Sequence, residues 1–271
     1  DRAESFADIC VIMSLKTKAD GAMTVGNGTK LPVWSTIGRA YGLVFANLAA
    51  FAALAALPVG LSIIVHSAAK GDATFNEDFT NILLDGMLVA GILPIVTMAL
   101  ATSAFGNELE DRTLGYLALM PLARWRIVLP KIMASLIICG PLLVISGTAA
   151  TLLGFDGEIR PALGVAAALA AGVIAYGTIF TWAGLVTTRA LPFALIYVLL
   201  WEGVISSFIQ GVDYLSVRGY TLAIMSGIDE SSFPALEERA IELPVAIGGA
   251  VVVTVVFFLL GVRRLSRMDV P

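Results

Sequence analysis

Residues 106–131 read GNELEDRTLGYLALMPLARWRIVLPK and stand between two long apolar stretches, residues 82–105 and 132–153. Acidic, basic and amphipathic residues are gathered in this segment, whereas its two neighbours are nearly free of charge. An α-helix needs about 20 predominantly apolar residues to cross the hydrocarbon core of a bilayer, and both neighbours are long enough. The segment is therefore predicted to be a charged loop between two membrane-spanning helices.

The composition of the whole chain also indicates a membrane protein. Of its 271 residues, 58% are hydrophobic and only 14% are charged, and the mean hydropathy is +0.89. A water-soluble chain of this length needs more charged residues to cover its surface. The sequence lacks the alternating strands of about ten residues that are typical of a transmembrane barrel. Helices are the remaining way to satisfy the backbone in lipid, so we predict an all-α membrane protein.

Six apolar stretches reach or approach the length of a transmembrane helix. They comprise residues 41–65, 82–105, 132–153, 162–186, 191–209 and 244–262. We therefore predict a cytoplasmic N-terminal segment over residues 1–39 and a six-helix transmembrane domain over residues 40–268. Residues 210–243, between the fifth and sixth spans, are mixed in character and contain Arg218. Short outer helices are expected there rather than a seventh span.

The distribution of basic residues predicts the orientation of these spans. If both termini are cytoplasmic, most of the 17 Lys and Arg residues fall in the inner segments, and the outer loops are acidic. The basic residues left outside are Lys70, Arg160, Arg218 and Arg239. Cytoplasmic loops of membrane proteins carry an excess of Lys and Arg. The N- and C-termini are therefore predicted to be cytoplasmic.

Several classes of function are not indicated. The net charge of −4 provides no basic field for nucleic acid. Cys10 and Cys139 lack the spacing of metal ligands, and the sequence shows no further ligands at a suitable spacing from His66, so no metal site is expected. The chain has no GxxxxGK[ST], HExxH or GxSxG motif. We expect no catalytic residue and no cofactor in this chain.

The charged loop combines a helix-forming stretch with interfacial residues. Glu108, Glu110 and Asp111 precede residues 112–119, and acidic residues at a helix N-terminus offset its dipole. Pro121 is expected to end this short amphipathic helix and to open the next one. Basic and tryptophan anchors for the headgroup region follow, namely Arg124, Trp125, Arg126 and Lys131. Two interpretations stay open: an ordinary inner loop, or a docking helix that a soluble partner moves.

Polar residues inside the predicted spans are functional candidates because ionisable groups are costly in hydrocarbon. Asp85 is close to the start of the second span and is expected at the outer interface. Glu202 lies deep in the fifth span, and Ser206 and Gln210 follow at four-residue steps on the same helix face. That face is predicted to point at a partner subunit, a water-filled path or the outer segment. A role in helix packing is an equal alternative.

The run from Glu108 to Lys131 resembles the loop between the second and third spans of type 2 ABC exporter permeases. Members of that class show an acidic residue, then Thr-Leu, an apolar stretch, Pro with a basic residue soon after, and Lys entering the third span. The matching positions are Glu108 or Glu110, Thr113 with Leu114, residues 117–119, Pro121, Arg124 and Lys131.

The resemblance implies a mechanism and partners. Two permease copies or homologues would form the path in the cytoplasmic (inner) membrane of a bacterium or archaeon, and two separate ATPase subunits would bind ATP and Mg. The loop helix would couple to the ATPase through Glu108, Glu110, Asp111, Arg112, Thr113, Leu114 and Leu117. Residues 34–39 would belong to an elbow helix on the inner leaflet.

Two other classes of protein are alternatives to an ABC permease. A non-transporting structural or assembly subunit of a larger membrane complex explains the spans equally well, but it does not explain the amphipathic loop. A secondary transporter is expected to show inverted repeats and broken helices with central polar sites. No clear repeat relates the two halves of the chain, and only Glu202 is deep.

Overall fold

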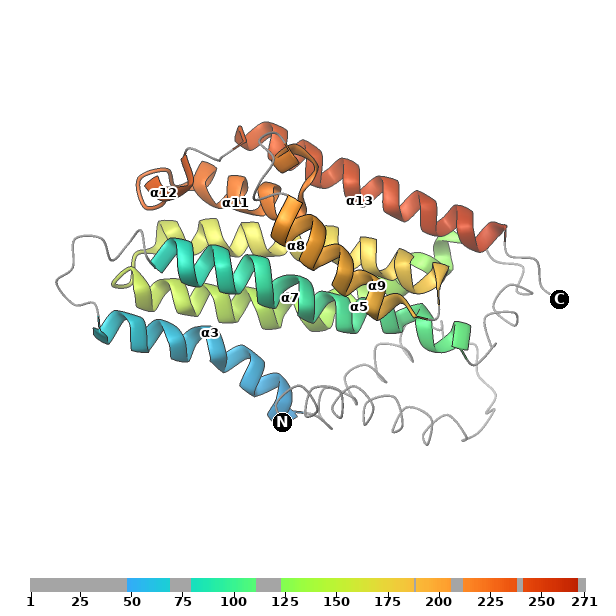
Figure 1. The fold of residues 1–271 in the computed structure, drawn as a ribbon, viewed down its shortest axis with the longest axis horizontal. Helices are drawn as coiled ribbons and strands as arrows, with labels where there is room; N and C mark the ends of the chain where they lie inside the picture. The colour runs from blue at the N-terminus through green and yellow to red at the C-terminus, as the bar shows by residue number, and fades with distance from the viewer. Residues whose placement is uncertain are drawn as a thin grey trace. The chain divides into compact units, whose positions relative to one another are not determined.

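A computed structural model describes residues 48–68, 79–110, 123–187, 189–205, 212–237 and 241–267 (Figure 1). Within these ranges every regular element is helical and no strand occurs, which confirms the prediction of an all-α protein. The predicted N-terminal segment and elbow helix, residues 1–39, lie outside the described residues. The same holds for residues 111–122, the centre of the charged loop.

The first half of the described chain contains four helices and one π-helical segment. They are α3 (Leu48–Ala68), the π-helical η1 (Phe79–Ile92), which continues directly into α5 (Leu93–Glu110), then α7 (Trp125–Gly154) and α8 (Ile159–Val186). Pro130 and Pro141 lie inside α7 without ending it, as membrane helices tolerate. A tight turn joins α7 to α8, and Gly157 adopts a positive φ of 87° there, a conformation that glycine accepts without steric cost.

The second half ends in a long helix and contains several short ones. These elements are α9 (Ala190–Tyr197), continuing into the π-helical η2 (Val198–Ile205), then the 3-10 turn η3 (Val212–Leu215), α11 (Val217–Ile228), α12 (Pro234–Glu237) and α13 (Leu243–Ser266). A proline in the first turn of α13 opens that helix, where the missing N–H costs nothing. Short helices therefore lie in the predicted interval between the fifth and sixth spans.

Four of the described helices are long and apolar enough to cross a membrane. They comprise Asn81–Gly106, Trp125–Gly154, Ile159–Val186 and Leu243–Ser266, and two shorter apolar helices comprise Ala56–Ser67 and Ala190–Glu202. The four correspond to the predicted second, third, fourth and sixth spans. The predicted first span begins, and the predicted fifth span ends, outside the described residues. The six-span topology and the cytoplasmic termini stay predictions.

Two helices extend beyond their apolar stretches toward the charged loop. The helix of the predicted second span, α5, reaches Glu110 rather than residue 105. The helix of the predicted third span, α7, begins at Trp125 rather than at residue 132. A helix satisfies its own backbone hydrogen bonds, so it continues past the apolar stretch into the interface. Glu108 and Glu110, which we expected to precede a separate helix, therefore lie in the last turns of α5. The helix dipole disfavours acidic side chains at that end, so Glu108 requires a compensating cation.

The helix α8 is the centre of the unit formed by residues 48–271. It packs against α5, α7, α11 and α13 (Figure 1). Of its most apolar window, 67% is buried, against 17% for α13. Glycines allow these close contacts, as in other membrane bundles. At Gly184, for example, an added Cβ would lie 2.3 Å from the carbonyl oxygen of Thr102 on α5.

Candidate functional site

Lys131 ties the two helices that flank the charged loop. Its Nζ donates to the carbonyl oxygen of Ala104 and to Oε1 of Glu108, each at 2.6 Å, and lies 4.6 Å from the ring centroid of Phe105. The Lys131 side chain is 12% exposed and the Glu108 side chain 31% exposed. We call this group of four residues the clamp. It supplies the cation that the C-terminal end of α5 needs, and it joins α5 to α7 where the loop leaves both helices.

An apolar cluster surrounds the clamp and connects it to two further helices. Its buried members are Phe105, Ile127, Val128, Ile132, Leu185 and Leu265. They come from α5, α7, the end of α8 and the end of α13. We call this side of the unit the loop end and the opposite side the far end. A displacement of the loop end of α5 or α7 therefore presses directly on α8 and α13.

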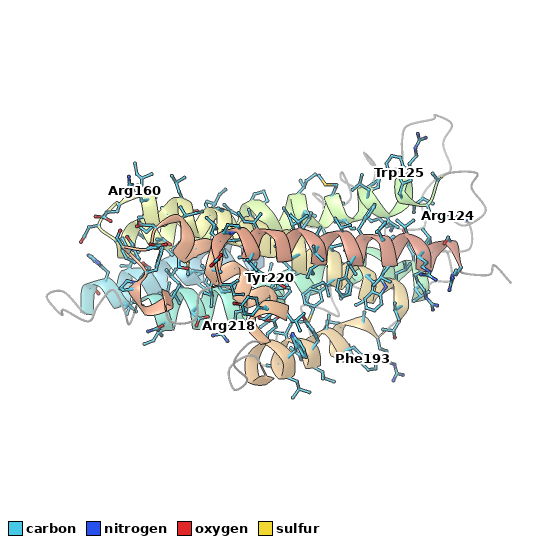
Figure 2. All side chains as sticks on the ribbon, turned by 90° about the horizontal axis from the view of Figure 1, so that it is seen from above. Arg124, Trp125, Arg160, Phe193, Arg218 and Tyr220 are labelled. Carbon is cyan, nitrogen blue, oxygen red and sulfur yellow. The ribbon has the colours of Figure 1, made fainter. Side chains whose placement is uncertain are left out.

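The predicted interfacial anchors lie at the start of α7. Arg126 stacks over the indole of Trp125 at 5.4 Å, and the Trp125 side chain is exposed. Figure 2 shows Arg124 and Trp125 at one end of the unit and Arg160 at the opposite end. Of the residues predicted to couple to an ATPase, Glu108 belongs to the clamp, and Glu110 lies on α5. The remaining ones, Asp111, Arg112, Thr113, Leu114 and Leu117, lie outside the described residues.

Glu202 lies at the N-terminus of α11 rather than on a free face. The residue is 1% exposed, and its carboxylate accepts hydrogen bonds from the Ser216 hydroxyl and from the backbone N–H groups of Val217 and Arg218 at 3.2 and 3.3 Å. The Tyr197 hydroxyl adds a bond at 3.3 Å. Unpaired N–H groups and the helix dipole make this end of a helix attractive to an anion. Ser216 itself is the N-cap of α11.

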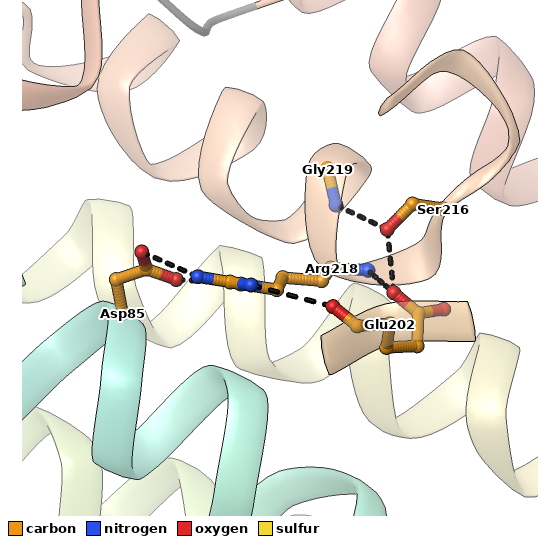
Figure 3. A network of polar contacts seen from close by, with 5 residues as sticks. All are labelled: Asp85, Glu202, Ser216, Arg218 and Gly219. Carbon is orange, nitrogen blue, oxygen red and sulfur yellow. Dashed lines mark hydrogen bonds and ion pairs between the residues drawn. The ribbon is translucent and has the colours of Figure 1, made fainter. Parts of the chain in front are cut away.

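Arg218 connects the Glu202 site to the second span (Figure 3). Its Nε and Nη2 donate to the two carboxylate oxygens of Asp85, at 2.8 and 2.7 Å, and its Nη1 donates to the backbone carbonyl of Glu202 at 3.4 Å. Such bidentate pairs are among the stronger polar contacts in proteins. We call Asp85, Glu202, Ser216 and Arg218 the polar network.

The structure gives Asp85 a partner that the sequence did not indicate. Its expected position at the outer interface stays a prediction, but within the protein its surface is only 6% exposed, and it pairs with Arg218, which is 133 positions away along the chain. For Glu202, the outer segment is the alternative that the contacts favour. Ser206 and Gln210, predicted to share its face, lie outside the described residues. In the sequence, the only sign of the pair was that Asp85 and Arg218 each stand alone as a charge among apolar residues.

A second polar group lies at the C-terminal end of α11, where Asp229 follows the last residue of the helix. The carboxylate of Asp229 accepts hydrogen bonds from the hydroxyls of Ser231 and Ser232, at 2.6 and 2.8 Å. Burial alone would raise the pKa of Asp229. The two hydroxyls, a backbone N–H and the charge of Arg160 outweigh that effect and hold the pKa below its ordinary value of 3.8. The turn between α11 and α12 is therefore stabilised by an ionised carboxylate.

The chemistry of these groups is that of holding helices together. Every oxygen of the Asp85 and Glu202 carboxylates accepts a hydrogen bond from Ser216, Val217 or Arg218. Within the described residues, no three His, Cys, Asp or Glu side chains lie close enough together to hold a metal ion.

The comparison with protein families agrees with this architecture. A family model described as ABC-2 family transporter protein matches residues 45–217, more than half of the chain. The match includes the clamp, Asp85 and Glu202, and it ends one residue before Arg218. No match was found among curated proteins or among solved structures. The chain therefore belongs to the ABC-2 transporter family and is a membrane permease component of an ABC transporter.

Proposed function

We propose that this permease is the membrane-spanning subunit of an ATP-driven exporter, and that residues 111–122 receive the motion of a separate ATPase. Two permease subunits, identical or homologous, form the path in the cytoplasmic membrane, and two ATPase subunits bind ATP and Mg. Family membership supports an ABC ATPase as the partner in general. The direction of transport follows from the resemblance of residues 108–131 to exporter permeases.

The observation that carries the proposal is the clamp. A loop can pass a force to the bilayer only if both of its ends are firmly attached to spanning helices. Lys131 bonds to two groups on α5, so a force on the loop moves α5 and α7 together. The apolar cluster around the clamp then passes the displacement to α8 and α13, since packed interiors transmit strain.

The charge of the loop end supports its cytoplasmic placement. The basic residues that lie beside the ends of α7, α9 and α13 at this side are Arg124, Arg126, Arg189, Arg263, Arg264 and Arg267. The turn between α7 and α8, at the far end, contains Asp156 and Glu158. Cytoplasmic segments carry the excess of Lys and Arg, and this is the side from which an ATPase reaches the loop.

The second candidate is a structural or assembly subunit that transports nothing. The clamp would hold such a bundle together as well as it holds a transporter. The two candidates differ in their dependence on nucleotide. Only a transporter requires an ATPase that binds the loop and changes the conformation of the spans when it hydrolyses ATP.

The test is hydrogen exchange of the purified complex with and without ATP, Mg²⁺ and vanadate. An ATPase is expected to co-purify, and nucleotide is expected to change the protection of α5. Leu114→Pro, which breaks the predicted loop helix, and Glu110→Lys should abolish this change. Glu158→Lys makes the same charge reversal at the far end and should preserve it. Purification without any ATPase, or identical exchange with and without nucleotide in the native chain, would favour the structural subunit.

A further inference from the structure

The polar network holds a short helix against two spanning segments. We propose that Arg218 is a positioning residue that latches α11 to the second and fifth spans, so that release of Arg218 opens the far end of the bundle. Glu202 belongs to η2, Asp85 to η1, and Arg218 to α11. The importance of this latch for transport rests on the proposed function, but the latch itself does not.

The depth of α11 places Arg218 within the bundle. Thr221 lies beside Gly172 near the middle of α8, whereas Met225 and Ile228 lie beside Gly164 close to the start of α8. The helix α11 therefore runs from the middle of α8 back toward the far end. Its N-terminus, with Arg218, is the inserted end, and releasing that end would uncover the middle of α8.

The charged groups of the network are paired with groups of the protein itself. Asp85 is neutralised by the guanidinium of Arg218 through two hydrogen bonds. The carboxylate of Glu202 is stabilised by the α11 N-terminus and by the Ser216 hydroxyl, where an anion needs no further cation. Because these groups are paired across three elements, their contacts assign the network to holding α11 in place.

Charged contacts suit a reversible attachment in a membrane. Apolar side chains gain little from leaving lipid for another helix, so the remaining contacts of α11 with α8 supply packing alone. The Arg218 side chain retains 15% exposure, and a long cationic side chain reaches water easily. If α11 moved away from the spans, water would solvate the charges of Arg218 and Asp85. Both carboxylates also lie on π-helical segments, a rare helix type that recurs at functional positions.

The test measures the exposure of the surface beneath α11 in the full chain, reconstituted in lipid nanodiscs. Thr221→Cys provides a buried thiol at this surface, and Cys10→Ser removes the cysteine of the N-terminal segment. Cys139 is kept because it is buried in α7 and reports loss of the whole fold. A membrane-impermeant maleimide is applied, and each site is read by peptide mass spectrometry.

Two variants separate a latch from a general structural role. Arg218→Gln leaves Asp85 buried without its cation. Asp85→Asn with Arg218→Gln removes both charges together, which keeps hydrogen-bonding groups at both positions and avoids an uncompensated buried charge. The double variant is therefore the decisive one, and Cys139 is expected to stay protected in it.

We expect the thiol at position 221 to react at least about tenfold faster in the double variant than in the parent, because about 1.4 kcal/mol in a local opening equilibrium corresponds to a factor of ten. Unchanged labelling at position 221, with Cys139 protected, would show that the charges do not hold α11. Labelling of both cysteines in the double variant would show that the network holds the entire fold, and the latch would be wrong. Neither result depends on an ATPase, so the proposed function stands or fails separately.

Discussion

Replacing Lys131 by methionine tests the clamp most directly. Methionine keeps an unbranched apolar stem against Phe105 but removes the ammonium group. The change deletes a charged hydrogen bond to the carbonyl of Ala104, worth about 1.5–3 kcal/mol. It also deletes the ion pair with Glu108, worth about 0.2–1 kcal/mol because water screens a partly exposed carboxylate. The expected loss of stability is about 3 kcal/mol.

The assay is thermal unfolding of the purified permease at fixed lipid and detergent. For a chain of this size, 1 kcal/mol shifts Tm by about 2–4 °C, so Lys131→Met should lower Tm by about 6–12 °C. Arg126→Met is the matched control, since Arg126 starts the same helix and is exposed. It loses only a cation–π contact with Trp125, worth about 0.5–1 kcal/mol.

A double-mutant cycle separates the ion pair from the carbonyl bond. Glu108→Gln should lower Tm slightly in the native background and should lose this effect beside Lys131→Met, because the ion pair with Lys131 is then already removed. If Lys131→Met and Arg126→Met unfold within about 2 °C of each other, the clamp does not stabilise the loop end. The mechanical role assigned to it would then lose its structural basis.

Two further predictions concern packing and pH. Gly184→Ala should lower the free energy of unfolding by about 1–3 kcal/mol, because the added Cβ would lie 2.3 Å from the backbone of α5. Gly248→Ala is the control, since its Cβ would meet nothing within 4 Å. In Tm measurements this control should be neutral or slightly stabilising. Asp229 has a pKa below its ordinary value in the folded chain, so its contribution is present above about pH 4 and is lost as pH falls. The Tm difference between the native chain and Asp229→Asn should therefore be largest near neutral pH and shrink in acid; a difference independent of pH would contradict this.

The apolar stretches predicted the long helices well because a helix in lipid is determined locally. Its length follows from the bilayer, and its hydrogen bonds lie within the segment. Helix ends were predicted less well for the same reason: hydrophobicity ends at residue 105, but the backbone bonds of α5 continue to Glu110. A charged residue in the interface does not stop a helix when a cation from another helix compensates it.

The pairing of Asp85 with Arg218 was not predictable from the sequence. Each residue appeared as an isolated charge, and 133 positions separate them. Their approach depends on how α11 folds back along α8, which small residues such as Gly164 and Gly172 allow. A periodic pattern identifies the face of one helix, but it does not identify the partner of that face. Glu202, by contrast, could be identified from the sequence, because its deep position within an apolar span is visible there.

The second span relates the two charged sites to each other. Asp85 and Glu108 lie near its opposite ends, roughly 35 Å apart at the rise of an α-helix, and each is held by a cation from a different element. A displacement of the loop end of α5 therefore changes the position of Asp85 relative to Arg218, provided that the span moves as a rigid rod. The π-helical segment η1 contains Asp85 and continues into α5 without a break, so no loop absorbs the motion. The helix that we propose receives force through the clamp thus also contains Asp85, the partner of Arg218 in the proposed latch.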